Sequence, residues 1–539
     1  MTETLDTIRQ RHAALEKEPL PENLGALLDA AAEQFGDRTC WVQLDANDEA
    51  GDSLSFAEIR DAVARCATVL AARGVGQGAR VALMLPSCPA FVITWLACAR
   101  LGAAIVPVNP GYTTEELGHL AALSEPGFAV VDRQYSDIFT AGTGLPETAC
   151  LRHDMDAGNS DWHKAVTDAM PMRDWPEVGA ETLVNLQFTS GSTGRPKACM
   201  LPQSYWLVLA AARAVQGPAL TRILLDMPFH YMGGQWRFLL ALRMGATVFV
   251  APRQSLARMI DRLVKHEIGF CSVTPAFAKQ PLDPRRERLS LRWAGTMAMA
   301  PDLVPEVSLR LGGAPVREMY GTTETGAIAA MPVEIEGRTG CGIAAPFRSL
   351  SIRDAEGRAL PAGAAGELWV KGPGIMLGYY RNPAASAEVL RDGWFRTGDL
   401  CRMDEDGFLT IVGRIKDTIR RSGENIAASE VEQVLSGLGF LEEVAAIAEP
   451  DPMRGEEVMV CVTLAPGQRP EDWPVERIAG RIAEEAAARL ARFKHPRYVT
   501  LISAMPRTAS GKMAKAELRK DLAAWRVASF DTAVRAERP

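Results

Sequence analysis

The sequence has little that would tie the protein to nucleic acid, to disulfides or to zinc. Acidic residues outnumber basic ones, 66 against 59 in 539 residues, and the formal net charge is -7. Without an excess of basic residues, the chain lacks the positive charge that is typical of DNA- or RNA-binding proteins. The 10 cysteines are scattered singly, with no CxxC pair and no Cys/His cluster. This pattern argues against a disulfide framework and a zinc site, so we expect buried free thiols.

Long apolar runs and targeting segments are also lacking. The longest apolar stretch, residues 81–108, is interrupted by Pro86, Ser87, Pro89 and Arg100. It fits a strand, a helix and a strand of a buried layer better than a membrane span. The first residues, Met-Thr-Glu-Thr-Leu-Asp, are acidic and lack the apolar core of a secretory signal. We therefore expect a cytoplasmic protein without stable membrane insertion.

The pattern of apolar residues predicts an α/β protein with more than one domain, because the chain is too long for one ordinary core. Amphipathic helices such as 56–73 alternate with short apolar strands such as 80–85 and 104–108. This alternation is typical of a doubly wound sheet. It continues further along the chain, with a strand expected at 223–227 and a helix at 255–265.

We expect the chain to divide near Gly413. Residues 1–413 form a large N-terminal domain of doubly wound sheets, with a small β-rich subdomain at about 338–412 where short strands alternate with Gly and Pro turns. Residues 414–526 form a small, mobile α+β C-terminal domain. Residues 527–539 form a frayed tail.

A run rich in glycine and hydroxyl groups, Gln-Phe-Thr-Ser-Gly-Ser-Thr-Gly-Arg-Pro-Lys, occupies residues 187–197 directly after a strand-like segment. Its glycines let backbone N–H groups turn inward, while its hydroxyls and its lysine add donors and positive charge for phosphate. It is not a Walker A motif, because no Ser or Thr follows the lysine. Taken alone, the run is also compatible with an ordinary turn. The expected ligand contacts are Thr189, Ser190, Gly191, Ser192, Thr193, Gly194 and Lys197.

Four further segments follow this run in order: YGTTETG at 320–326, WFRTGD at 394–399, GRIKD at 413–417 and PRTASGK at 506–512. Together the five segments resemble the signature set of the adenylate-forming superfamily, which includes acyl-CoA synthetases, adenylation domains and luciferases. The resemblance covers nearly the whole chain. Residues 393–409 and 419–431 look most like carboxylate–CoA ligases of the crotonobetaine/carnitine and short to medium-chain acyl type.

The resemblance implies an acid–thiol ligase. Such an enzyme adenylates a carboxylic acid with ATP, releases pyrophosphate, transfers the acyl group to CoA and releases AMP. Its cofactor would be Mg²⁺, with ATP and CoA as cosubstrates. Two other functions stay open: a free-standing adenylation enzyme that loads a carrier-protein phosphopantetheine, and a non-catalytic nucleotide-binding relative. The sequence determines neither the acid nor the oligomeric state, for which a homodimer is one option.

The resemblance also implies roles for single side chains. Lys512 occupies the position that supplies positive charge where the carboxylate meets the α-phosphate. Glu324 is expected to hold Mg²⁺ and Thr323 to touch the α-phosphate. Each residue also has a plainer interpretation, such as a solvated lysine, core packing or a turn cap. The remaining nucleotide contacts would be Tyr320 on adenine, Gly321, Thr322, Asp399 on the ribose hydroxyls and Arg414 beside it.

The second half-reaction adds further positions. The resemblance places a hinge at Lys416, a CoA channel beside Gly423, and a gate between the ATP and acyl pockets at His230. For His230 a core histidine is the alternative. Tyr231 and Trp236 would line an apolar pocket or form an aromatic cage for a quaternary ammonium group. The acyl-pocket residues are expected to be Tyr231, Gly234, Trp236, Met297 and Gly326.

Overall fold

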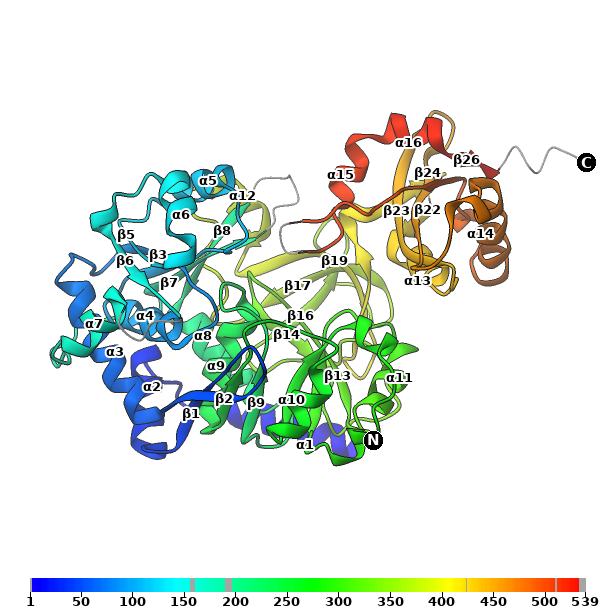
Figure 1. The fold of residues 1–539 in the computed structure, drawn as a ribbon. Helices are drawn as coiled ribbons and strands as arrows, with labels where there is room; N and C mark the ends of the chain where they lie inside the picture. The colour runs from blue at the N-terminus through cyan, green and yellow to red at the C-terminus, as the bar shows by residue number, and fades with distance from the viewer. Residues whose placement is uncertain (1, 156–159, 190–195, 423, 509–510, 533–539) are drawn as a thin grey trace, which may run out of the picture.

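The protein consists of a large N-terminal body and a smaller C-terminal unit at one end of it (Figure 1). The computed structural model describes residues 2–155, 160–189, 196–422, 424–508 and 511–532. Within these residues two large sheets and their helices form the body, and a third, β-rich sheet leads to the α+β unit. The predicted α/β fold class is confirmed.

Six strands form the first N-terminal sheet. All neighbouring strands run parallel except the last pair, which is antiparallel. The central strands are buried on both faces, as parallel strands covered by helices must be. In spatial order the strands are β6 (Cys150–His153), β5 (Phe128–Asp132), β3 (Arg80–Met84), β4 (Ala104–Pro107), β7 (Leu183–Thr189) and β8 (Lys197–Pro202).

Nine strands form the second sheet. Its middle is parallel and both of its edges are antiparallel, so the edges are built from local hairpins. In spatial order the strands are β15 (Ile343–Ala344), β14 (Gly326–Ala330), β13 (Val316–Thr322), β12 (Trp293–Thr296), β11 (Phe270–Val273), β9 (Arg222–Leu225), β10 (Thr247–Val250), β1 (Thr39–Leu44) and β2 (Ala50–Ser55).

Helices link the two sheets through one continuous apolar core. Helices α4 (Pro89–Arg100) and α8 (Gln203–Ala214) are buried on almost every side, and Trp95 meets Trp206 edge-on with ring centroids 5.0 Å apart. The other helices of the body are α1 (Thr2–Leu15), α2 (Leu24–Phe35), α3 (Phe56–Ala71), α5 (Thr114–Ser124), α6 (Ser136–Thr143), α7 (Asp161–Asp168), α9 (Met232–Met244), α10 (Met259–Lys265), α11 (Leu303–Arg310) and α12 (Pro383–Val389).

The helix expected at 255–265 begins only at Met259. Met259 and Ile260 are the first residues of the buried apolar face. Arg258, just before them, is turned toward another part of the chain by an ion pair with Asp48 (2.8 Å). The apolar pattern therefore predicted the helix correctly, but tertiary contacts determined where it starts.

A five-stranded antiparallel sheet follows the body. It begins later than the expected subdomain, because the short strand Ile343–Ala344 pairs with β14 of the nine-stranded sheet instead. The strands are β16 (Ser349–Arg353), β17 (Ala365–Lys371), β18 (Leu390–Arg391), β19 (Trp394–Met403) and β20 (Leu409–Arg414).

The C-terminal unit has its own sheet and its own apolar core. The tail expected to be frayed from Val527 is folded as far as Thr532, because Phe530 and Asp531 form an edge strand on β25. Strands of the unit are β21 (Thr418–Arg421), β22 (Glu424–Ala427), β23 (Leu441–Asp451), β24 (Gly455–Leu464), β25 (Tyr498–Leu501) and β26 (Phe530–Asp531), and its helices are α13 (Ala428–Leu435), α14 (Val475–Arg489), α15 (Lys515–Lys520) and α16 (Leu522–Ala528).

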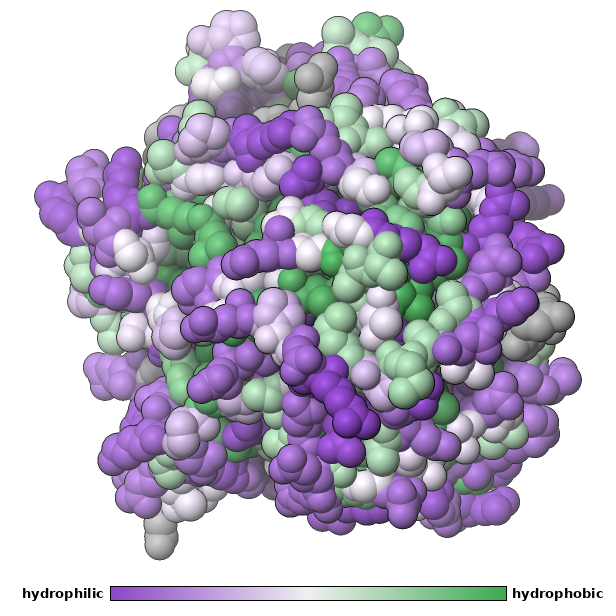
Figure 2. Space-filling view, turned by 90° about the vertical axis from the view of Figure 1, so that its left-hand side faces the viewer, coloured by the Kyte–Doolittle hydropathy of each residue, from purple (hydrophilic) through white to green (hydrophobic). Residues whose placement is uncertain are grey.

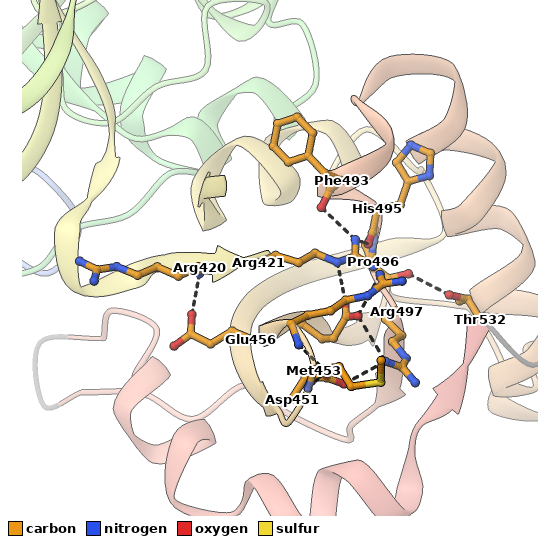
Figure 3. A network of polar contacts seen from close by, with 12 residues as sticks. Arg420, Arg421, Asp451, Met453, Glu456, Phe493, His495, Pro496, Arg497 and Thr532 are labelled. Carbon is orange, nitrogen blue, oxygen red and sulfur yellow. Dashed lines mark hydrogen bonds and ion pairs between the residues drawn. The ribbon is translucent and has the colours of Figure 1, made fainter. Parts of the chain in front are cut away.

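A polar network ties β21 to the rest of this unit. Arg421 donates from Nη1 to the carbonyl oxygens of Phe493 (2.9 Å) and His495 (3.3 Å), as Figure 3 shows. The carboxylate of Glu457 is fully buried and pairs with Arg421 (2.7 Å) and with Arg497 (3.2 Å). A buried carboxylate between arginines is compensated only while every partner stays in place.

None of the described helices is long and apolar enough to cross a membrane. On the face of the N-terminal body that Figure 2 shows, hydrophilic side chains dominate and apolar ones occur in small groups among them. All ten cysteines are free, and nine of them are buried, as expected from their scattered positions.

Replacing Glu457 by Gln is expected to destabilise the C-terminal unit by about 3 to 5 kcal/mol, because the partly buried arginines around this fully buried position lose their counter-charge. The measurement is the thermal unfolding midpoint of the whole chain. Glu471→Gln, at an exposed glutamate without an ion pair in the described chain, is the control and should shift it little. Equal midpoints for the two variants would contradict the importance of the network.

Candidate active site

Several predicted site residues lie at the turn between β13 and β14. The two strands approach so closely that a Cβ atom on Gly321 would lie 2.2 Å from the carbonyl oxygen of Gly326. Only glycine fits at position 321 without moving the backbone. Thr322 ends β13, and the turn leaves Thr323 and Glu324 half-buried at its tip. The turn can therefore present a hydroxyl and a carboxylate to a ligand.

Asp399 is a buried carboxylate with two protein partners. The hydroxyl of Tyr320 donates to its Oδ2 atom (2.5 Å), and Nε of Arg414 lies 3.0 Å from its Oδ1 atom. Asp399 and Arg414 are direct neighbours across β19 and β20. Burial and the charge of Asp399 raise the pKa of Tyr320, so its hydroxyl stays protonated and donates. These contacts join the nine-stranded sheet to the five-stranded sheet.

A residue that the sequence analysis did not single out, Tyr379, connects two predicted site residues. Its hydroxyl donates to Oε1 of Glu324 (3.0 Å), and Nζ of Lys197 lies 4.7 Å from the centroid of its ring. The backbone beside it also binds the turn, since the N–H of Met376 donates to the carbonyl of Glu324 (2.8 Å). The only signal in the sequence is the Gly-Tyr-Tyr that ends a glycine-rich stretch.

The glycine- and hydroxyl-rich run starts and ends on two paired strands. Thr189 is the last residue of β7 and Lys197 the first of β8, and the two lie opposite each other. The hydroxyl of Thr189 donates to the carbonyl of Lys197 (3.4 Å). The structure thus places the Lys197 end of the run beside Tyr379 and pairs Thr189 with Lys197. The other predicted contacts, Ser190, Gly191, Ser192, Thr193 and Gly194, lie outside the described residues, as does Gly423.

A buried amide network holds the backbone at His230. Gln187 donates from Nε2 to the carbonyl of His230 (2.9 Å), and Gln235 donates to that of Phe229 (2.7 Å). Asn185 in turn donates to Oε1 of Gln235 (2.8 Å). Sequence reasoning missed these residues, although polar side chains inside an apolar strand are a usable signal. Burial lowers the pKa of His230 to about 4, so its ring is neutral at pH 7.

The five residues expected at the acyl pocket occupy different environments. Gly234 is packed inside α9, where a Cβ atom would lie 2.9 Å from a backbone oxygen. Gly326 has a positive φ of 70° and starts β14. The ring of Tyr231 lies 4.3 Å from the imidazole of the preceding histidine. Trp236 is half-buried, whereas Met297 is 56% exposed.

Lys416 precedes the first strand of the C-terminal sheet, and Lys512 lies between its strands β25 and β26. Lys416 follows β20 in a short 3-10 helix, and burial together with a neighbouring arginine lowers its pKa. Lys512 is exposed and belongs to a tight turn, in which its N–H donates to the hydroxyl of Thr508 (3.2 Å). Within the described part of the chain, Lys512 forms no ion pair with a site carboxylate.

The fold and the five motifs together define an adenylate-forming enzyme. The chain belongs to the AMP-binding enzyme family, whose pattern it matches over residues 28–380, with the AMP-binding enzyme C-terminal domain over residues 430–512. The expected superfamily is therefore confirmed.

Relatives agree with this assignment over most of their length. An indoleacetate–CoA ligase of Aromatoleum aromaticum is 33% identical, over 87% of this chain and 93% of that protein. A feruloyl-CoA synthase of Amycolatopsis is also 33% identical, over 87% and 94%. The ATP-bound crystal structure of MatB from Rhodopseudomonas palustris superposes with a TM-score of 0.81 at 26% identity, over 92% and 98%. The narrower resemblance to carnitine-type ligases is not confirmed by these relatives.

We expect His230 to make the protein sensitive to acid. Because its pKa is about 4 in the folded chain and about 6.5 in an unfolded one, the unfolded state gains a proton first as pH falls. Below pH 6.5 this difference lowers the free energy of unfolding, by about 2 kcal/mol between pH 7 and pH 5. His230→Gln should therefore lose less stability over that interval than the native chain.

The measurement is the thermal unfolding midpoint at pH 7 and pH 5. His119→Gln serves as the control, because His119 is exposed on α5 and its loss should leave the acid sensitivity unchanged. The interpretation would be wrong if both variants lost as much stability as the native chain.

Proposed function

We propose that the protein is an ATP-dependent carboxylate–CoA ligase, which forms an acyl-adenylate with release of pyrophosphate and then transfers the acyl group to CoA with release of AMP. The observation that carries this proposal is the turn at 320–326. Its first residue, Tyr320, is joined to Asp399, and its central residue, Glu324, is joined through Tyr379 to Lys197. In this proposal the one turn contacts both the nucleoside and the phosphates of the nucleotide.

The names of the relatives support CoA as the acceptor and an acid with an aromatic ring. Indoleacetate and ferulate are both aryl acids, and both relatives are named for CoA chemistry. A half-buried Trp236 and a neutral His230 are suited to an apolar ring, because neither adds charge to its surroundings.

In the proposed first step a carboxylate attacks the α-phosphate, so two anions must meet. Lys512 supplies positive charge at the attacked phosphate and Lys197 at the outer phosphates, which stabilises charge in the transition state. The hydroxyl of Thr323 hydrogen-bonds to the α-phosphate. The outer phosphates are bound by the glycine- and hydroxyl-rich run, at Thr189, Ser190, Gly191, Ser192, Thr193 and Gly194.

The nucleoside would be held on the other side of the turn. The ring of Tyr320 packs on adenine with the backbone of Gly321 and Thr322 beside it. Asp399 accepts hydrogen bonds from the ribose hydroxyls, for which its oxygens still have free lone pairs beside those used by Tyr320 and Arg414.

Glu324 fits the Mg²⁺ that the family implies. Its carboxylate is half-buried, and only its Oε1 atom accepts a hydrogen bond from Tyr379. The described residues contain no group of three or more His, Cys, Asp or Glu side chains that could hold a metal ion. A single carboxylate together with nucleotide oxygens is a usual Mg²⁺ environment. When bound, the ion would neutralise phosphate charge.

For the second step, Lys416 serves as the hinge of the C-terminal unit and Gly423 lines the CoA channel, with the domain boundary at 413/414. His230 separates the nucleotide from the acyl group as a neutral gate. Tyr231, Gly234, Trp236, Met297 and Gly326 shape the acyl pocket. We also propose that the protein is cytoplasmic and forms a homodimer.

The decisive experiment measures pyrophosphate release from ATP and Mg²⁺ over a panel of aryl, short-chain and medium-chain acids, with and without CoA. We expect CoA-stimulated turnover with aryl acids and a loss of at least about 100-fold in Lys512→Ala, because the charge at the α-phosphate is removed. Lys520→Ala, on the exposed side of α15, is the control. Turnover that needs a carrier protein instead of CoA would favour the carrier-loading alternative, and no turnover with any acid would contradict the proposal.

Tyr379 gives a second test, because the sequence motifs do not include it. Tyr379→Phe removes the hydrogen bond to Glu324 and keeps the ring beside Lys197. A hydrogen bond to a charged group is worth about 1.5 to 3 kcal/mol, so kcat/KM for ATP should fall about 10- to 100-fold. The neighbouring Tyr380→Phe is the matched control. Equal kcat/KM values in both variants would show that Tyr379 does not position Glu324.

A further inference from the structure

Two arginines are buried beside Trp236 at the wall of the proposed acyl pocket. Arg213 lies in the last turn of α8 and Arg237 on α9, and their exposed fractions are 7% and 3%. Their guanidinium carbons lie 5.5 Å and 4.7 Å from the centroid of the Trp236 ring. Both pKa values fall to about 10 through burial, so both side chains stay charged at pH 7.

Neither of these cations has an anionic partner within ion-pair distance among the described residues. Arg213 donates one hydrogen bond, from Nη1 to Gln216 (2.9 Å), and its buried Nε atom has no acceptor. Arg237 donates to the carbonyl of Gly233 (2.7 Å) and to the hydroxyl of Ser272, and its Nε atom likewise has no acceptor. Burying a charge without a counter-charge costs several kcal/mol.

Other buried arginines of the chain show what a purely structural role looks like. Arg262 is paired with Asp48 (3.0 Å). Arg348 donates to several carbonyl oxygens, among them those of Thr325 (2.7 Å) and Pro373 (2.6 Å). Protein groups balance the charge in both cases: a carboxylate pairs with Arg262, whose Nε atom also lacks a hydrogen bond, and several carbonyl oxygens accept from Arg348. Arg213 and Arg237 have neither a paired carboxylate nor a comparable set of acceptors among the described residues.

The surroundings of the pair hold more donors than acceptors. The side-chain nitrogens of Gln216 and Trp293 are also buried without an acceptor. One buried acceptor also lacks a hydrogen bond, Oδ2 of Asp226. The charge of this carboxylate acts on Arg237 from beyond ion-pair distance, and burial raises its pKa. A surplus of donors and positive charge is complementary to an anion. The nearby Trp236 and Ser272 are half-buried, so solvent reaches this wall.

We propose that Arg213 and Arg237 form a subsite for a second carboxylate, at the end of the acid remote from the reacting one. The inference rests on the proposed ligase function and narrows its substrate to dicarboxylic acids with an aryl or other apolar middle. The ring of Trp236 packs on that middle, and the two guanidinium groups balance the distal charge. The same positive charge opposes a quaternary ammonium group at Trp236, because like charges repel.

The test compares matched acids that differ only in the distal group: phenylacetic acid with 4-carboxyphenylacetic acid, and hexanoic acid with adipic acid. CoA-dependent AMP formation by the native enzyme should show a kcat/KM at least about tenfold higher for the diacid of each pair. A ratio near one, or a preference for the monoacid, would overturn the subsite while leaving the ligase function intact. No AMP formation with any of the four acids would instead count against the ligase function.

Variants then assign the preference to these residues. Arg213→Gln and Arg237→Gln should bring the diacid-to-monoacid ratio close to one, and Arg213→Lys, which keeps the charge, should retain part of it. Arg243→Gln, in the last turn of α9 and paired with Glu18 (3.5 Å), is the control and should keep the native ratio. Because the readout is a ratio within one enzyme preparation, partial unfolding of a variant does not change it. An unchanged ratio in Arg213→Gln and Arg237→Gln would overturn the assignment.

Discussion

The structure around the site depends on one buried carboxylate, Asp399. It lies where the nine-stranded sheet, the five-stranded sheet and the segment leading to the C-terminal unit come together, and it is held by Tyr320 from one sheet and Arg414 from the other. Removing this charge from water is costly, and the short contacts on both sides compensate for the cost. The same contacts hold the end of β13 from which the turn with Glu324 starts, so the proposed nucleotide site and the joining of the two sheets depend on the same residues.

The family resemblance singled out site residues that are close together in the chain. Gly321 and Glu324 belong to one turn between β13 and β14, where a Cβ atom at position 321 would collide with the opposite strand. Tyr379 could not be predicted in this way. It reaches Glu324 only because its segment crosses over to pair at β8, where an isolated bridge joins it to Cys199.

The other features that the sequence did not predict also depend on contacts between residues far apart in the chain. In a helical pattern an arginine is expected on the solvent side, so Arg213 and Arg237 gave no signal until both helices were seen to bury them. The edge strand at Phe530 depends on a distant partner, β25, which no local pattern identifies. Apolar periodicity therefore predicts which elements exist, whereas the burial of single charges follows from how those elements pack.

The exposed Lys512 and the buried pair Arg213 and Arg237 are suited to different roles. Lys512 is exposed on a turn of the C-terminal unit, and a lysine on a flexible stem can follow a charge that develops during a reaction. Arg213 and Arg237 are planar, buried and packed against an aromatic ring, so they offer fixed donors whose position is set before any ligand arrives. Fixed charges distinguish a charged substrate from an uncharged one, because the uncharged one leaves the buried cations unpaired. In the proposed enzyme, selectivity for the acid would therefore reside in the large N-terminal body, apart from the proposed catalytic lysine.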